Sequence, residues 1–229
     1  MKIAIIGEIH PEGWKTLEKS DFNAFEVANI EKDNLKKALE DVDGIIIRSA
    51  PNLTSDILKD CRKIKIIARH GVGYDNVDLE YLNQNNIALG VTGTSNAVSV
   101  AEHVLASFLY LTKNINLSDK LTRSGGFKNK SSLPDFFELY KKNIVIFGFG
   151  RIGKALAKRC IGFETNVYVF DPFISDSEIN EHNCIPVDKI EGIKLADYIS
   201  VHLPLNKDTK NFISDEELGL MKNSVIIAN

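Results

Sequence analysis

Residues 143–171 read NIVIFGFGRIGKALAKRCIGFETNVYVFD, and this stretch decides the fold of the second half of the chain. The apolar, β-branched run at 144–147 has the composition of a buried parallel strand. A G-x-G-x-x-G pattern follows at 148–153, and apolar residues then recur at helical spacing. A second buried strand at 167–170 ends on Asp171. The order of strand, glycine turn, helix, strand and acid predicts a dinucleotide-binding βαβ unit.

Each special position in this unit has a physical role in binding a dinucleotide. Gly148 permits the tight turn out of the strand, Gly150 leaves room for a pyrophosphate, and Gly153 lets the helix pack on the strand. Backbone amides and the positive end of the helix dipole hold the phosphates. Asp171 accepts hydrogen bonds from the adenosine ribose. The alternative is a glycine-rich turn in an ordinary α/β unit, which the flanking strands and the acid disfavour.

Length and composition are typical of a soluble globular protein. The chain has 229 residues, of which 44% are hydrophobic and 26% charged, so one large or two small domains are expected. A net charge of -3 gives no reason to expect nucleic acid or a membrane surface as a partner. No apolar run reaches the length of a membrane span, and residues 1–14 read as a first strand rather than a signal peptide.

The three cysteines are widely spaced and form no zinc pattern. We therefore expect reduced thiols, a cytoplasmic location and no bound metal.

Strand-like and helix-like segments alternate along the chain, which predicts an α/β fold with two doubly wound parallel-sheet domains. In the first 91 residues the expected strands lie at 2–6, 24–27, 44–48, 64–68 and 87–91. Beyond the glycine-rich unit, further strands are expected at 198–202 and 224–228, and residues 119–142 read as a helix end and a polar surface loop.

Two features of this pattern bear on assembly and on completeness. The segment 96–114 is apolar over most of its helical surface, so we expect a deeply buried helix that also acts as a hinge between the domains. The chain ends at Asn229, directly after the strand at 224–228. Because ligands bind at the carboxyl ends of strands in open α/β sheets, we expect part of the binding site to be missing.

The segment RHGVGYDNVD at 69–78 is a first candidate for substrate binding. Gly71 and Gly73 follow a buried strand, where successive backbone amides can hold a carboxylate. The alternative is a plain strand-to-helix turn with Asn76 or Asp78 as the helix cap.

Arg48 and Ser49 form a second candidate at the end of the strand 44–48. The planar fork of arginine suits a carboxylate or a phosphate, although a solvated strand end would look the same. His202 ends a later strand just before Leu203 and Pro204. A cofactor-lining role is favoured over proton transfer, because no acid partner lies nearby in the sequence.

Taken together, the ordered motifs resemble the D-isomer-specific 2-hydroxyacid dehydrogenases, most closely the branch that acts on 3-phosphoglycerate. The shared motifs are GIIIRSA (44–50), ARHGVGYDNVD (68–78), NAVSVAEH (96–103), GFGRIG (148–153), VFDP (169–172), HLPLNKDT (202–209) and SVIIAN (224–229). The resemblance implies a flavodoxin-like substrate-binding domain over residues 1–96. It also implies an NAD-binding Rossmann domain over 97–229 that is incomplete at its C-terminus.

The resemblance also implies roles for individual residues. Those expected to bind the substrate are Arg48, Ser49, Gly71, Val72, Gly73 and Asn96, with Asn96 at the cleft between the domains. Those expected to bind the cofactor are Val72, Gly148, Phe149, Gly150, Arg151, Ile152, Gly153, Asp171, Pro172, His202, Leu203 and Pro204. The implied activity is hydride transfer between NAD(H) and a small 2-hydroxy or 2-keto acid, with 3-phosphoglycerate, the substrate of the first step of serine biosynthesis, as a candidate.

The departure from the family lies at the end of the chain. In the family an arginine follows the SVIIAN motif, and a glutamate and a histidine come later; together they polarise the carbonyl and move the proton. None of the three is present in residues 1–229, so we expect this polypeptide to be inactive and to bind NAD weakly at best. The alternatives are an NAD-binding or dimerising regulatory protein, or a remnant. The family commonly dimerises through the region of 97–111, so a homodimer is expected.

Overall fold

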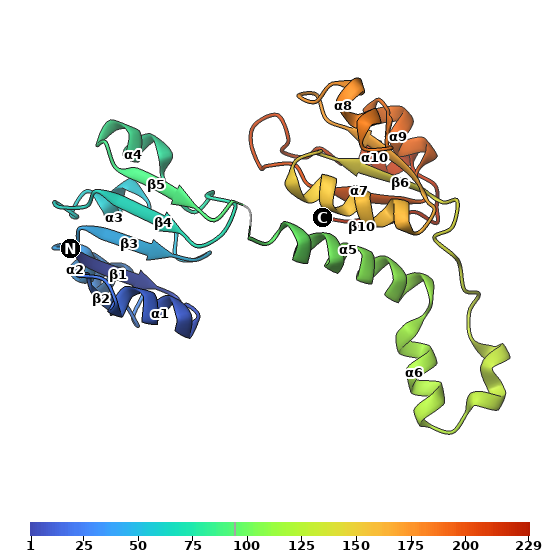
Figure 1. Ribbon diagram of the computed structural model, residues 1–229, viewed down its shortest axis with the longest axis horizontal. Helices are drawn as coiled ribbons and strands as arrows, with labels where there is room; N and C mark the ends of the chain where they lie inside the picture. Colours follow the sequence, from blue (N-terminus) through green and yellow to red (C-terminus); the bar gives the residue numbers. More distant parts are fainter. Residues whose placement is uncertain (94) are drawn as a thin grey trace. The chain divides into compact units, whose positions relative to one another are not determined.

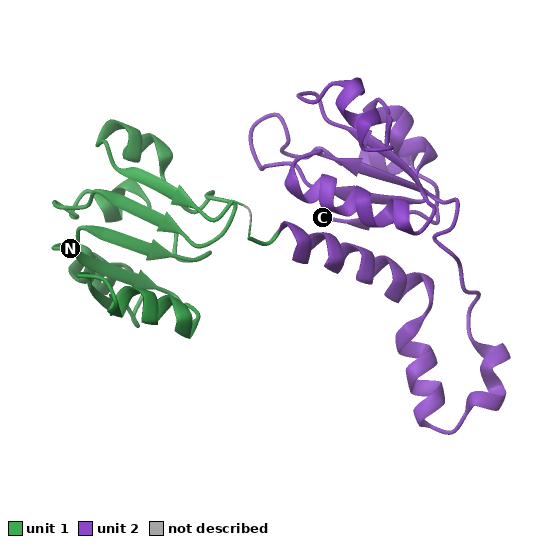
Figure 2. Cartoon of the chain, viewed as in Figure 1, with its two compact units in different colours: residues 1–96 green, residues 97–229 purple. Residues whose placement is uncertain are grey.

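The computed structural model of the chain describes residues 1–93 and 95–229. The chain separates into two compact units, residues 1–96 and residues 97–229 (Figure 2). Each unit contains a parallel five-stranded sheet and hydrophobic core clusters of its own. The predicted α/β fold with two parallel sheets is therefore confirmed.

The sheet of unit 1 has the strand order β2-β1-β3-β4-β5, with every neighbouring pair parallel (Figure 1). This is the flavodoxin-like order. Its strands are β1 (Lys2–Ile6), β2 (Asn23–Glu26), β3 (Gly44–Ile47), β4 (Ile66–Arg69) and β5 (Ala88–Val91). Its helices are α1 (Pro11–Glu18), α2 (Lys32–Leu39), α3 (Ser55–Leu58) and α4 (Leu79–Gln84).

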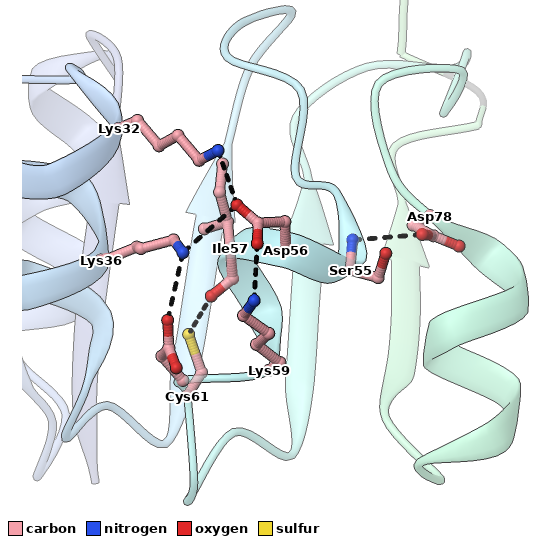
Figure 3. A network of polar contacts seen from close by, with 9 residues as sticks. Lys32, Lys36, Ser55, Asp56, Ile57, Lys59, Cys61 and Asp78 are labelled. Carbon is pink, nitrogen blue, oxygen red and sulfur yellow. Dashed lines mark hydrogen bonds and ion pairs between the residues drawn. The ribbon is translucent and has the colours of Figure 1, made fainter.

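The core of unit 1 lies between the sheet and helices α2 and α3. Leu35 and Leu39 of α2 are fully buried against the sheet, as is Leu58 of α3. Outside this core, the two helices are joined by ion pairs to Asp56, which accepts from Lys32 at 2.7 Å (Figure 3). Hydrogen bonds from this and neighbouring lysines hold the pKa of Asp56 well below its ordinary value.

The sheet of unit 2 has the order β10-β9-β6-β7-β8, which is the dinucleotide-binding order for its five strands. Its strands are β6 (Asn143–Phe147), β7 (Asn166–Phe170), β8 (Ile185–Pro186), β9 (Tyr198–Val201) and β10 (Ile226–Ala228). Its helices are α5 (Ala97–Thr112), α6 (Ile115–Arg123), the 3₁₀ helix η1 (Phe127–Ser132), α7 (Arg151–Gly162), α8 (Asp176–Glu181), α9 (Lys189–Leu195) and α10 (Asp215–Leu220).

Helices cover both faces of this second sheet. On one face α5 and α7 lie side by side (Figure 1). Phe108 of α5 and Leu156 of α7 are fully buried in the core cluster on this face. On the other face α9 and α10 bury Val145, Phe147 and Ile199. The α5 helix is tied to the sheet by a buried hydrogen bond of 3.0 Å between the hydroxyls of Thr112 and Tyr198.

Two of the differences from the sequence prediction lie around α6. The stretch 119–142 holds most of α6 and all of η1 rather than only a helix end and a loop. The helix expected over 96–114 ends at Thr112, because Asn114 takes a left-handed conformation with φ of 47° and α6 starts afresh behind it.

Candidate functional site

The turn after β6 requires glycine at its first position. Gly148 has a φ of +97°, which side chains with a Cβ rarely adopt. A Cβ at this position would also lie 2.8 Å from the carbonyl oxygen of His202, which follows the neighbouring strand β9. Gly148 therefore lets the chain turn sharply between two strand ends that lie close together.

The other two glycines of the motif have opposite surroundings. A Cβ on Gly153 would overlap the carbonyl oxygen of Gly148, so the start of α7 is pressed directly onto the turn. A Cβ on Gly150 would meet no heavy atom within 4 Å. Packing thus explains Gly153 but not Gly150, and the open space beside Gly150 is where the backbone could be approached by a ligand.

The start of α7 supplies the groups that an anion needs. Gly150 is the N-cap and carries no side chain to satisfy the amides of the first turn. Such amides lack intrahelical acceptors and, with the helix dipole, favour a phosphate. Arg151 is exposed at the first helical position and Ile152 is half-buried next to it. The residues present therefore fit a pyrophosphate.

Asp171 lies at the carboxyl end of β7 and faces this turn. Its Oδ2 accepts a hydrogen bond of 2.7 Å from the amide of Phe149, and its Oδ1 accepts one of 2.9 Å from the amide of Phe173. The side chain of Phe149 is fully buried, with its ring 5.3 Å from that of His182. Phe149 can therefore contact a ligand only through its backbone, whereas Pro172 is exposed.

His202 follows β9 on the other side of the turn. Its Nε2 lies 2.8 Å from the hydroxyl of the fully buried Ser200. Burial lowers the pKa of His202 to about 4, so the ring is neutral at pH 7. A neutral ring fits the predicted lining role better than proton transfer. Leu203 is half-buried and Pro204 is exposed beside it.

The order of the second sheet reverses between β6 and β9. This is the topological switch point, where ligands bind in open α/β sheets. The structure brings every cofactor candidate of unit 2 to the carboxyl ends of β6, β7 and β9: Gly148, Phe149, Gly150, Arg151, Ile152, Gly153, Asp171, Pro172, His202, Leu203 and Pro204. Val72, the remaining candidate, belongs to unit 1.

In unit 1 the switch point lies between β1 and β3, and Arg48 follows β3 there. Arg48 is exposed, its side chain passes over Gly7, and its Nη1 donates to the carbonyl oxygen of Glu8 at 3.3 Å. Ser49 is exposed next to it. A guanidinium at this edge can meet an anionic ligand.

The Gly71–Gly73 loop lies on the neighbouring strand end. The side-chain amide of Asn76 is buried, and its Nδ2 donates to the carbonyl oxygens of Arg48 and Pro51, at 3.1 and 3.3 Å. Asp78 caps α4 by accepting from the amide of Tyr81 at 3.0 Å. The segment 69–78 therefore ends in a helix cap and is bound through Asn76 to the backbone of Arg48. Val72 is exposed at its tip.

Arg69 is a residue to which sequence reasoning gave no role. It ends β4, and its Nη1 donates 2.6 Å to the carbonyl oxygen of His70. The guanidinium occupies the space that a Cβ on Gly71 would need. Its Nε is buried without a hydrogen-bond partner among the described residues. The signal in the sequence was the cation two positions before the first glycine of the loop.

Asn96 is exposed at the end of unit 1, immediately before α5. In the described part of the chain, no group of three or more His, Cys, Asp and Glu side chains could hold a metal. The same residues include no helix with the length and apolarity of a membrane span.

Comparison with known proteins gives a consistent result. A family model described as D-isomer specific 2-hydroxyacid dehydrogenase, NAD binding domain, matches residues 105–229. The chain is 32% identical over 231 residues to D-3-phosphoglycerate dehydrogenase of Methanocaldococcus jannaschii, covering 100% of this chain and 43% of that protein. It is 32% identical over 204 residues to hydroxypyruvate reductase of Thermotoga maritima, covering 88% of this chain and 64% of that protein.

A solved structure is similar over nearly the whole chain. NAD+-bound 3-phosphoglycerate dehydrogenase of Entamoeba histolytica superposes with a TM-score of 0.78 at 30% identity, covering 97% of this chain and 68% of that one. The chain therefore spans less than half the length of the first relative and about two thirds of this structure.

Proposed function

Because this chain belongs to the D-isomer-specific 2-hydroxyacid dehydrogenase family, we propose that it binds NAD on the turn at 148–153 and serves hydride transfer with a small 2-hydroxy or 2-keto acid. The observation that carries the proposal is the contrast between Gly153, which packing requires, and Gly150, which packing does not require but which caps the first turn of α7 beside open space. The match to the family's NAD-binding domain independently supports NAD as the cofactor. When bound, NAD supplies the hydride acceptor or donor.

The residues of unit 2 would hold the two halves of the adenosine diphosphate group. The first turn of α7 receives the pyrophosphate, and the remaining acceptor sites of Asp171 receive the ribose hydroxyls. The neutral ring of His202, with Leu203 and Pro204, provides an uncharged wall. These residues bind and orient the cofactor and move no proton.

Asp171 also sets the choice between NAD and NADP. A 2′-phosphate would meet its carboxylate, and like charges so placed cost several kcal/mol. The next residues, Pro172 and the 93% exposed Phe173, offer no positive charge to offset this repulsion. We expect titration calorimetry to give a lower dissociation constant for NAD than for NADP, and a smaller gap for Asp171→Ala. Comparable constants for the wild-type chain would contradict the assignment.

The substrate class follows from unit 1. The amides of the Gly71–Gly73 loop suit a carboxylate, and Arg48 with Arg69 supplies positive charge for a second anionic group. A three-carbon acid with a phosphate, such as 3-phosphoglycerate, fits this set best, and the relatives that are phosphoglycerate dehydrogenases support it. The proposal places the protein at the first step of serine biosynthesis.

Binding measurements separate this substrate from unphosphorylated acids. We expect 3-phosphoglycerate to bind the chain more tightly than glycerate. Arg48→Ala should remove most of this difference, because it weakens binding of the phosphate, which glycerate does not carry. Equal binding of the two acids by the wild-type chain, or a preference for glyoxylate or pyruvate, would show that the arginines do not select a phosphate.

The α5–α6 region supports the proposal of a homodimer. Near the junction of these helices the apolar side chains of Tyr110, Leu111 and Ile115 are 46%, 53% and 46% exposed. A second copy of the chain would cover this surface. For location we propose the reducing cytoplasm, which the three buried, unpaired cysteines support.

A further inference from the structure

The carboxylate of Asp171 accepts hydrogen bonds from two backbone amides of the protein itself. Its Oδ2 accepts the amide hydrogen of Phe149, the second residue of the glycine turn, at 2.7 Å. Its Oδ1 accepts the amide hydrogen of Phe173, at the start of its own loop, at 2.9 Å. Hydrogen bonds from backbone amides to an ionised carboxylate are short and about twice as strong as neutral ones. Asp171 therefore joins the end of β7 to the turn that follows β6.

These two bonds leave the carboxylate free to bind a ribose as well. An ionised carboxylate offers about four lone-pair sites, two on each oxygen. The backbone amides use one site on each oxygen, so one site on each remains for the two ribose hydroxyls. Binding the backbone and binding the ribose are thus compatible in one side chain.

The bond to Phe149 bears on the part of the turn that faces the pyrophosphate. The side chain of Phe149 is fixed in the core, and Gly148 before it is pressed against the carbonyl oxygen of His202. The amide of Phe149 is held by Asp171 alone among the described contacts of that group. The next residue, Gly150, is the open position and the N-cap of α7. The direction of the Phe149 peptide consequently sets how Gly150 and the first turn of α7 face a phosphate.

We propose that Asp171 is a positioning residue for the pyrophosphate in addition to a ribose ligand: it fixes the glycine turn in its binding geometry before NAD arrives. The inference rests on the proposed NAD site and assigns a second role to one of its residues. It predicts that Asp171 contributes to the affinity for a dinucleotide that has no ribose hydroxyls on its adenosine half.

The first test compares NAD with its 2′,3′-dideoxyadenosine analogue on the wild-type chain and on Asp171→Ala. If Asp171 positions the turn, the substitution weakens binding of the analogue about tenfold or more, the value of one hydrogen bond to a charged group. If Asp171 only binds the ribose, the substitution weakens NAD and leaves the analogue unchanged, and the inference is overturned.

A matched control removes a nearby negative charge without touching the turn. Asp176 lines the same cavity of about 340 Å³ as Asp171, and in the described part of the chain it bonds to no amide of the glycine turn. Asp176→Asn should leave the affinity for the analogue unchanged. An equal loss in both variants would trace the effect to a general disturbance of the cavity and would overturn the positioning role.

The second test needs no ligand and therefore stands even if the NAD proposal fails. Hydrogen exchange of the Phe149 amide is measured by NMR in the unliganded chain, with the amides of β6 as internal reference. Asp171→Ala should speed exchange at Phe149 relative to β6, and Asp171→Asn, whose amide oxygen can still accept the bond, should restore part of the protection. Unchanged exchange at Phe149 in Asp171→Ala would overturn the inference, whereas failure of the wild-type chain to bind either dinucleotide would count against the proposed function alone.

Discussion

Among single residues, Gly153 is the glycine of the turn whose replacement should lower stability through packing. A Cβ on Gly153 overlaps the carbonyl oxygen of Gly148, so Gly153→Ala should destabilise unit 2 by about 1–3 kcal/mol or more. Gly162, the last residue of the same helix, has open space around it, so Gly162→Ala should be neutral or slightly stabilising. Urea denaturation followed by circular dichroism measures both. Equal stability of the two variants would show that the helix does not press on the turn.

His202 should make the stability of the folded protein depend on pH, and its burial determines the direction of that dependence. Its folded pKa of about 4 lies below the ordinary value of 6.5, so unfolding takes up a proton between these values. The contribution to stability is complete above pH 6.5 and is lost as the pH falls towards 4, by about 3 kcal/mol at most.

Replacing the ring tests this dependence directly. His202→Asn keeps a hydrogen-bonding partner for Ser200 but has no proton to gain, so its stability should change less between pH 7 and pH 4.5 than that of the wild type. Trp14, the single tryptophan, lies in unit 1, and its fluorescence supplies an internal control for the other unit. If the unfolding free energy of the wild type changed with pH no more steeply than that of the variant, this result would contradict the lowered pKa of His202.

The candidate residues differ in how far the sequence could define them. Gly148, Gly150 and Gly153 were predictable because this glycine spacing, between a strand and a helix, is typical of a dinucleotide-binding turn. The amide bond of Phe149 to Asp171 was not, because it depends on the distance between the ends of two neighbouring strands. The position of Arg69 was also not predictable, because the sequence does not show where the side chain of a cation before a glycine loop will point.

At the scale of elements, strands with four or more consecutive apolar residues were predicted well. The run at 144–147 is an example, since both faces of its strand are buried and its composition shows this directly. The short elements β8 and α9 carry little periodicity, and the sequence pattern did not predict them. Helix α6 was predicted only as a helix end, because its sequence borders a Gly-Gly pair, which favours a loop over a helix when only local sequence is considered.

The apolar surface around the α5–α6 junction carries the prediction of a dimer. Leu111→Glu places a charge on this surface, where Leu111 is 53% exposed, and should shift a dimer to a monomer because a buried unpaired charge is costly. The matched control is Leu218→Glu on α10, where Leu218 is 51% exposed outside this surface. Sedimentation velocity at micromolar concentration distinguishes the two. A wild-type monomer, or an equal effect of both substitutions, would exclude this surface as the interface.

At the scale of the whole molecule, the two units repeat one construction. In each, the backbone amide at the start of the sheet's first strand in chain order donates to an aspartate that precedes a neighbouring strand: Lys2 of β1 to Asp43 at 2.7 Å, and Asn143 of β6 to Asp197 at 2.9 Å. In each, candidate ligand groups follow a strand beside the switch point: β3 in unit 1, and β6 and β9 in unit 2. The alternation of strands and helices in the sequence predicted both sheets. The two amide-to-aspartate bonds could not be predicted, because they join residues about 40 to 55 positions apart that only the folded structure brings together.

We assign the space beside Gly150 to the pyrophosphate of NAD. The most direct test is an equilibrium titration of NAD up to millimolar concentration against the wild-type chain and Gly150→Ala. With no atom within 4 Å of the added Cβ and an ordinary φ of -74°, the variant should fold as stably as the wild type. We predict saturable binding by the wild type and a loss of about tenfold or more in the variant, a change of about 1.4 kcal/mol. Equal affinity of the two proteins, or no binding by the wild type, would contradict the claim.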